Sequence, residues 1–467
     1  MTATENIDGR PGNVTSRKAT ITRGGWLLPL RQRLATPVEP FSLAAFRILF
    51  GSVMCYAMVR FLARGWVKML YLDPVFHFPW VPFIQPWPGI WMYVHVVVLA
   101  ICALGITLGL FYRISAALFC VGFTYLEFLD RTAYLNHYYL AGLLSFLLIW
   151  MPANCQWSLD VWLRPELLRQ TVPLWTILLL RFQLIVVYLF AGLAKLNTDW
   201  LFAAEPLRIW LMASSDLPLI GPCLAEPWAA FFSSWFGVAH DLLVPVLLLF
   251  ARTRPWAYLA AILFHLTTAI LFPIGMFPWI MLASTTIFFS PGWPRALLDR
   301  LNHSRPRSEN SKSEQIATQS SNTISTFALA LIAIYCFFQV LVPLRSWLYP
   351  QQGAWDVRGF NFAWRVMLVE KTGYAEFFAV SPLTGDRKEI PLSDYITPRQ
   401  QMMMAQDPFQ IRALAQFLGH EYPGYEIHVD AFATLNGRPS QRIVRDDVNL
   451  ASSKISNWIV PLAHDPN

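Results

Sequence analysis

Long apolar runs separated by short polar or charged stretches dominate the chain as far as about residue 345. A helix needs roughly 20 mostly apolar residues to cross a bilayer. Nine runs meet or approach this length, and they cover residues 40–63, 89–111, 115–130, 134–152, 173–195, 227–250, 255–272, 273–290 and 325–345. The third run is short, and only Pro273-Ile274-Gly275 separates the seventh from the eighth, so the pattern leaves the count open by one.

From about residue 346 the pattern changes to that of a soluble domain. Alternating apolar and polar positions predict two hairpins, FFAVSPLTGDRKEI and IHVDAFATLNGRPSQRIV, the second with an Asn-Gly turn. Residues 397–419, which lie between them, are predicted to be helical. The pattern therefore predicts a polytopic α-helical membrane bundle of about nine spans with a C-terminal α+β exoplasmic domain.

Basic residues set the predicted orientation, because cytoplasmic loops are rich in lysine and arginine. Arginines gather in the N-terminal tail and in the loop that precedes the last apolar run. We therefore expect a flexible cytoplasmic tail at 1–39 and an exoplasmic soluble domain at 346–467. A transmembrane catalytic domain would fill 40–345, with a flexible inner loop near 303–324. The membrane would be the inner membrane of a bacterium or the endoplasmic reticulum of a eukaryote.

Composition agrees with a membrane protein, since 55% of the residues are hydrophobic and 14% are charged. Topology explains the net charge of +7, so we expect no nucleic-acid partner. Of the six cysteines, only Cys223 falls in a predicted outer loop, and none has the spacing of a metal site. We therefore expect neither a structural disulfide nor a bound metal.

The run from Val172 to Trp200 is apolar enough to cross a membrane, yet it contains Arg181 and Lys195. Seven residues make nearly two helical turns, so Arg181, Tyr188 and Lys195 are predicted to share one stripe. A cation inside a bilayer costs at least ~2.5–3.5 kcal/mol and usually faces a polar interior. The alternative is that Lys195 extends to the membrane surface and only anchors the helix.

Further polar residues fall at the outer half of the predicted bundle, among them His137, His265 and the pair His240-Asp241. Each has a structural alternative: a histidine can be hydrogen-bonded in the core, and Asp241 can neutralise Arg181 or Arg47. Buried charges on one side of a bundle also suit an ion- or proton-coupled transporter or a channel. The residues alone leave these alternatives open.

The chain resembles the vitamin K-dependent gamma-glutamyl carboxylase family from about Pro40 onward. The matching stretches are SLAAFRILFG, ALGITLGLFYRIS, FLDRTAYLNHYYLAGLLSF, VYLFAGLAKLNTDW, FPIGMFPWIMLASTTIFFSPGWPR and LNGRPSQRIVRDDV. Single stretches of this kind are weak, whereas their order and spacing together are quite specific.

The resemblance implies an enzyme that oxidises vitamin K hydroquinone with O2 and uses the energy to add CO2 to glutamate side chains of a peptide. It implies that Lys195 is the base that deprotonates the hydroquinone and that the pair Asn136-His137 lies in the active site. Hydroquinone oxidation would then generate a base strong enough to remove a glutamate γ-proton. A lysine must be neutral to begin this, and a pocket without water favours the neutral amine.

We expect His137, Lys195 and His265 to line one cavity that opens toward the outer domain. Tyr188, Gly192, Met276 and Asn136 are the further residues expected at the quinone. The partners implied are the lipid bilayer and a glutamate-containing peptide, and the oligomeric state stays open.

The chain also departs from animal members of the family. It ends at Asn467, lacks a counterpart of the disulfide that ties their outer domain to the membrane part, and has Thr268 where their pattern has asparagine. These departures concern recognition of a protein substrate more than quinone chemistry. A quinol epoxidase without peptide carboxylation is therefore the closest alternative.

Overall fold

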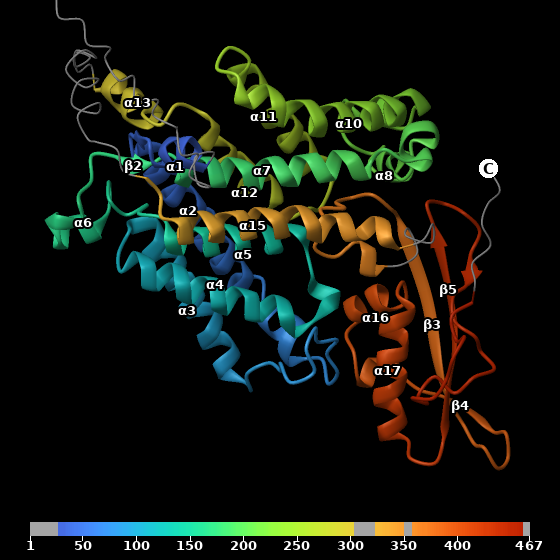
Figure 1. The fold of residues 1–467 in the computed structure, drawn as a ribbon. Helices are drawn as coiled ribbons and strands as arrows, with labels where there is room; N and C mark the ends of the chain where they lie inside the picture. The colour runs from blue at the N-terminus through green and yellow to red at the C-terminus, as the bar shows by residue number, and fades with distance from the viewer. Residues whose placement is uncertain (1–26, 303–322, 350–356, 461–467) are drawn as a thin grey trace, which may run out of the picture.

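The computed structural model describes residues 27–302, 323–349 and 357–460. A bundle of helices forms one part of the molecule, and a small sheet covered by two helices stands at one end of it (Figure 1). Most of the predicted tail at 1–39 and of the predicted inner loop at 303–324 lies outside the described residues.

A helix occupies each of the nine predicted apolar segments. These helices are α2 (Phe41–Ala63), α3 (Ile90–Leu108), α4 (Tyr112–Leu129), α5 (Asn136–Trp150), α7 (Trp175–Ala194), α10 (Pro227–Leu249), α11 (Arg254–Leu271), α12 (Phe277–Thr285) and α15 (Thr326–Leu344). Within the described residues, six helices are long and apolar enough to cross a membrane, namely α2, α3, α4, α7, α10 and α15 with its continuation to Leu348.

The predicted count of nine spans is therefore not confirmed. Helix α5 has 15 residues and is about 22 Å long, which is less than the thickness of a hydrocarbon core. Helix α12 is shorter still, and α11 is less apolar because it begins at Arg254 and contains His265.

Short helical elements lie before, between and after the long helices. In the bundle they are α1 (Leu27–Ala35), α6 (Leu159–Leu163), α8 (Leu207–Met212), α9 (Gly221–Leu224), α13 (Trp293–Leu301), the π-helical turns η1 (Lys68–Leu72) and η4 (Asp199–Ala203), and the 3-10 turns η2 (Arg131–Ala133), η3 (Pro165–Leu167) and η5 (Thr286–Phe288). The 3-10 turns η6 (Arg345–Leu348) and η8 (Val357–Gly359) follow α15, and η9 (Leu392–Asp394) lies in the sheet domain. Strands β1 (Pro37–Val38) and β2 (Val172–Pro173) pair antiparallel. This pair holds the start of α2 beside the start of α7.

The C-terminal sheet has four antiparallel strands in the order β4-β3-β5-β6. They are β3 (Lys371–Val380), β4 (Arg387–Glu389), β5 (Glu426–Leu435) and β6 (Gln441–Arg442). Both predicted hairpins are present, and β3 pairs with β5 along its whole length, from Lys371 opposite Leu435 to Val380 opposite Glu426. Alternate residues of β5 are buried, so one face of the sheet packs against helices.

Two helices, α16 (Pro398–Met404) and α17 (Pro408–Glu421), replace the single helix expected at 397–419. The side chains of Thr397 and Asp407 accept hydrogen bonds from backbone N–H groups at the two helix starts. Because Asp407 caps a new helix there, the chain turns between α16 and α17.

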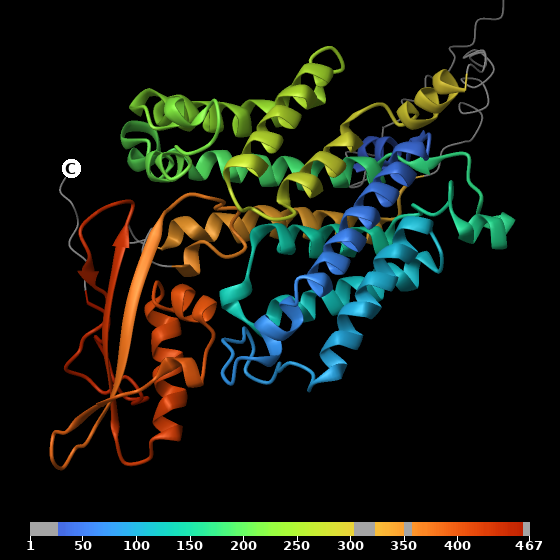
Figure 2. The same ribbon diagram turned by 180° about the vertical axis from the view of Figure 1, so that it is seen from behind.

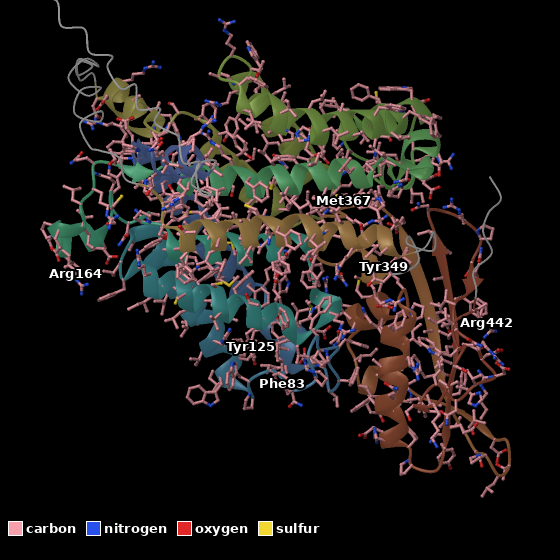
Figure 3. The ribbon with its side chains drawn as sticks, viewed as in Figure 1. Phe83, Tyr125, Arg164, Tyr349, Met367 and Arg442 are labelled. Atoms are coloured by element: carbon pink, nitrogen blue, oxygen red, sulfur yellow. The ribbon has the colours of Figure 1, made fainter. Side chains whose placement is uncertain are left out.

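Polar contacts hold the sheet domain against the bundle. Arg438 donates two hydrogen bonds to the Asp199 carboxylate, at 2.8 and 2.7 Å, and the amide of Asn436 donates a third at 2.8 Å. On α16, Gln400 donates to Asp130 Oδ2 at 2.7 Å. Figure 3 shows Arg442 of the sheet domain and Arg164 of the bundle at opposite ends of the molecule.

Candidate active site

Lys195 caps the C-terminal end of α7 and points into the bundle. Its Nζ donates hydrogen bonds to Asp241 Oδ2 at 2.8 Å and to the carbonyl of Ala191 at 3.2 Å. The ring of Trp200 lies 5.4 Å from Nζ. Lys195 and Asp241 therefore form a buried ion pair between α7 and α10, and the Lys195 ammonium lies inside the bundle, not on its surface.

Asp241 neutralises neither of the arginines considered from the sequence. Arg181 instead donates hydrogen bonds to the carbonyls of Ile287, Phe288 and Phe289. Arg47 is likewise surrounded by backbone carbonyls, among them that of Ile106. The three residues predicted to share one side of α7 therefore have different surroundings. Arg181 bonds to backbone carbonyls, whereas Tyr188 and Lys195 line a cavity.

His240 extends the ion pair by one residue. Its Nδ1 lies 2.9 Å from Asp241 Oδ1, and its ring stacks on Phe264 at 3.8 Å between centroids. Its Nε2 is buried without a hydrogen-bond partner among the described residues. Lys195, Asp241 and His240 therefore form a continuous polar row inside the bundle.

Gly192 allows α7 and α10 to come close enough for this ion pair. A Cβ atom at Gly192 would lie 2.7 Å from Leu242 Cδ2 and 3.2 Å from Asp241 Cβ. Gly192 is not among the residues that line either cavity described below. The structure thus places Gly192 at the helix contact, one turn before Lys195.

A mainly apolar cavity of about 280 Å³ contains the Lys195 side chain, and we name it the Lys195 cavity. Its polar groups are few and include Tyr188, Lys195, Asp241 and His265. The Tyr188 hydroxyl lies 3.1 Å from His265 Nε2, whereas His265 Nδ1 is buried without a partner among the described residues. Phe236, Phe264 and Phe272 belong to the apolar wall.

A second cavity of about 650 Å³ lies beside the first, and we name it the His137 cavity. Asn136, His137 and Met276 line it. Five charged residues line it as well: Arg60, Arg64, Glu127, Arg365 and Arg399. The Asn136 amide donates a hydrogen bond to the Arg365 carbonyl at 3.4 Å.

The expectation of one cavity for His137, Lys195 and His265 is therefore corrected to two adjoining cavities. Ile274, Phe277, Val366 and Met367 line both. The division arises because the connection between α11 and α12 and the segment before β3 come together there. Figure 3 shows Met367 near the outer end of α7.

Sequence reasoning did not identify the partner of Lys195 or the four arginines of the His137 cavity. The His240-Asp241 pair inside an apolar run was a visible signal, although nothing in the sequence joined it to Lys195 rather than to an arginine. Among the described residues, no group of three or more His, Cys, Asp or Glu side chains is arranged to hold a metal ion.

Comparison with family models gives two matches that together cover most of the chain. Residues 35–293 match the HTTM domain. Residues 324–465 match the lumenal domain of vitamin K-dependent gamma-carboxylase. No solved structure matches the chain. Since the first match alone covers more than half of the 467 residues and the second follows it in order, this chain belongs to the vitamin K-dependent gamma-glutamyl carboxylase family.

Proposed function

We propose that this membrane protein uses vitamin K hydroquinone to drive the carboxylation of glutamate side chains in a peptide. The observation that carries the proposal is the position of Lys195. The Lys195 amine is buried, pairs with Asp241 and lies in an apolar cavity. The family to which the chain belongs implies use of vitamin K hydroquinone.

The residues of the Lys195 cavity fit a hydroquinone. Phe236, Phe264 and Phe272 offer apolar surface for the rings, and the few polar groups suit one oriented ligand. Tyr188 and His265 would hold a ring hydroxyl, because His265 Nδ1 still lacks a partner. When bound, the hydroquinone supplies, together with O2, the oxidation whose energy removes the weakly acidic γ-proton of glutamate.

Lys195 would act as the base toward the hydroquinone hydroxyl. The Asp241 carboxylate accepts a hydrogen bond from Nζ at 2.8 Å and so holds the amine at the cavity. Once Nζ has released one proton, its lone pair can accept the proton of the hydroxyl. Asp241 therefore serves as a positioning residue, and His240 holds its other oxygen.

The residues around Lys195 also limit access of water. Trp200 covers the ammonium, and the side chains of Lys195 and Asp241 are only 8% and 7% exposed. Exclusion of water protects strongly basic species from being quenched by solvent protons. Asn136 and His137 would act from the neighbouring cavity, where His137 can donate a hydrogen bond to developing negative charge.

The test is to supply purified protein in nanodiscs with vitamin K hydroquinone, O2, labelled CO2 and a glutamate-containing peptide. We expect vitamin K epoxide and label fixed in the peptide, both lost in Lys195→Met/Asp241→Asn and both retained in the control Lys388→Met, which changes an exposed lysine. Epoxide without fixed label would leave only the epoxidase. Absence of both products would refute the proposal.

A further inference from the structure

The Asp241 carboxylate is shared by two bases. Its Oδ2 accepts a hydrogen bond from Lys195 Nζ at 2.8 Å, and its Oδ1 lies 2.9 Å from His240 Nδ1. Helix α10 carries both Asp241 and His240 and packs against α7 and α11, which Figure 2 shows beside it (green to yellow-green). All three side chains are buried. One negative charge therefore stands between two groups that can each carry a positive charge.

The contact with Asp241 determines which nitrogen of His240 is a base. A carboxylate accepts hydrogen bonds, so in the neutral ring Nδ1 carries the hydrogen and Nε2 holds the lone pair. That Nε2 is buried without a hydrogen-bond partner among the described residues. Buried polar atoms are normally paired, so a basic nitrogen without a partner in the core calls for a functional explanation.

The rings around His240 suit an imidazolium cation. Phe264 stacks on the His240 ring, with 3.8 Å between centroids and 15° between the ring planes. The ring centroids of Tyr188 and Phe236 lie 5.8 and 6.3 Å away. Aromatic rings attract cations, most strongly where water is excluded. A positive charge on His240 would thus be stabilised by Asp241 on one side and by aromatic rings on the others.

The titratable side chains around His240 come from three helices: Asp241 on α10, Tyr188 and Lys195 on α7, and His265 on α11. Among these, only Asp241 is negative at neutral pH, because a tyrosine hydroxyl stays protonated there. Two cations beside one carboxylate would leave an uncompensated charge in the core, which is strongly unfavourable. At neutral pH the group therefore holds one positive charge, either on Lys195 or on His240.

We propose that His240 is a positioning residue that takes over the positive charge of Lys195, so that a neutral amine is present at the cavity at neutral pH. In this exchange one N–H bond of the Lys195 ammonium breaks, one N–H bond forms at His240 Nε2, and Asp241 stays ionised. The net charge of the three groups does not change, so neither form leaves the carboxylate unpaired. The inference rests on the proposed function only for the use of the neutral amine.

This exchange predicts a distinctive pH dependence for Lys195. Both forms of the group hold the same number of protons, so the fraction of neutral amine stays constant while the group keeps one exchangeable proton. A lysine that must release its proton to solvent behaves differently, because its neutral fraction rises about tenfold for each pH unit below its own pKa. The two behaviours separate most clearly between about pH 7 and 8.5, above the ordinary range of histidine and below that of lysine.

The experiment measures the neutral amine directly, without any quinone. Purified protein in nanodiscs is treated briefly with fluorodinitrobenzene, a small apolar reagent that modifies neutral amines, and labelled peptides are quantified by mass spectrometry. We expect labelling of Lys195 to change by less than about twofold between about pH 7 and 8.5. Lys388, which is exposed on the sheet domain, is the internal standard and should gain about tenfold per pH unit.

His240→Asn separates the charge from the hydrogen bond, because the asparagine amide can still donate to Asp241 but cannot take up a proton. We expect its Lys195 labelling to rise about tenfold per pH unit and to be at least about tenfold below wild type at pH 7. Hydroquinone oxidation should fall with it at pH 7 and recover as the pH is raised. His95→Asn is the matched control in α3, where His95 contacts the Gly122 carbonyl, and it should keep the constant labelling of Lys195.

Constant labelling retained in His240→Asn would show that His240 only supports Asp241, and would overturn the inference. Wild-type labelling of Lys195 that rises about tenfold per pH unit, or that is absent below about pH 9, would overturn it too, and this result needs no variant to fold. If wild-type labelling is constant as expected but no hydroquinone is oxidised, the proposed function fails while the charge exchange stands.

Discussion

Lys195 and Asp241 meet across the contact between α7 and α10, with 2.8 Å between Nζ and Oδ2. Both side chains are almost fully removed from solvent. Burial of two charges carries a desolvation penalty that their attraction only partly offsets, so such a pair is weak evidence for stability alone. A pair that also opens into an apolar cavity is better explained by chemistry that needs an amine there.

The first prediction separates the chemistry of Lys195 from its contribution to the fold. Lys195→Ala leaves the Asp241 carboxylate buried and unpaired, so we expect loss of hydroquinone oxidation together with about 3–5 kcal/mol lower stability. Lys195→Met/Asp241→Asn removes both charges and should recover most of that stability without recovering activity. Thermal unfolding in detergent and epoxide formation measure the two effects.

Asp241→Asn alone completes this set of variants. The ammonium of Lys195 then stays buried without its partner, so the variant should be less stable than the double variant. We expect its oxidation rate to fall because the amine is no longer held at the cavity. Full activity in the double variant would remove Lys195 from the mechanism.

The second prediction concerns the glycine that lets the two helices approach. Gly192→Ala places a Cβ atom 2.7 Å from Leu242 Cδ2, so α10 must shift and carry Asp241 with it. We expect a loss of about 1–3 kcal/mol in stability, typical of overpacking, and slower hydroquinone oxidation. Gly142→Ala is the control, because its new Cβ would have its nearest neighbour, Thr124 Oγ1, at 3.7 Å. Equal effects of the two substitutions would show that helix proximity at Gly192 is unimportant.

Local patterns predicted the elements of this fold well. The apolar runs form helices, and the Asn-Gly pair at 436–437 begins the connection between β5 and β6. Helical periodicity placed Tyr188 and Lys195 on the same side of one helix, and both side chains line one cavity. These features depend on residues close together in the chain, where spacing determines which side chains share a face.

Long-range partners could not be predicted in the same way. Periodicity gives the direction of Lys195 but not the helix packed there, so Asp241, 46 positions away, remained one of several alternatives. The division into two cavities depends on Phe277 and Met367, which come from distant segments. Arg60 and Arg365 likewise line one cavity although they lie far apart in the chain.

The third prediction concerns topology. The lumenal-domain match places the sheet domain on the exoplasmic side, and Arg164 lies at the opposite end of the molecule (Figure 3). In a Cys223→Ser background, which removes the exposed native thiol, Lys388→Cys should react with an impermeant maleimide on intact bacterial cells that express the protein in their inner membrane. Arg164→Cys should react only after permeabilisation. Labelling of both from the same side would contradict the predicted orientation.

The fourth prediction concerns the attachment of the sheet domain to the bundle. Hydrogen bonds from Arg438, supported by Asn436, lower the pKa of Asp199 below its ordinary value. A carboxyl group whose pKa is lower in the folded state stabilises that state above its unfolded pKa of about 3.9. This contribution is lost as the pH falls through the folded value, so attachment should be constant between about pH 5 and 8 and weaken only below about pH 4.

Asp199→Asn should remove this acid dependence and loosen the attachment at neutral pH by about 1 kcal/mol, since the pair is partly exposed. Hydrogen exchange of residues 366–371 measures the effect, because this segment begins with Val366 and Met367, which line both cavities, and joins the sheet at β3. Asp430→Asn is the control: it removes a carboxylate bonded to arginines within the sheet, so exchange at 366–371 should not change. If Asp199→Asn leaves exchange of this segment unchanged, the Asp199–Arg438 pair does not hold the sheet domain against the bundle, and other contacts such as Gln400 with Asp130 supply the attachment.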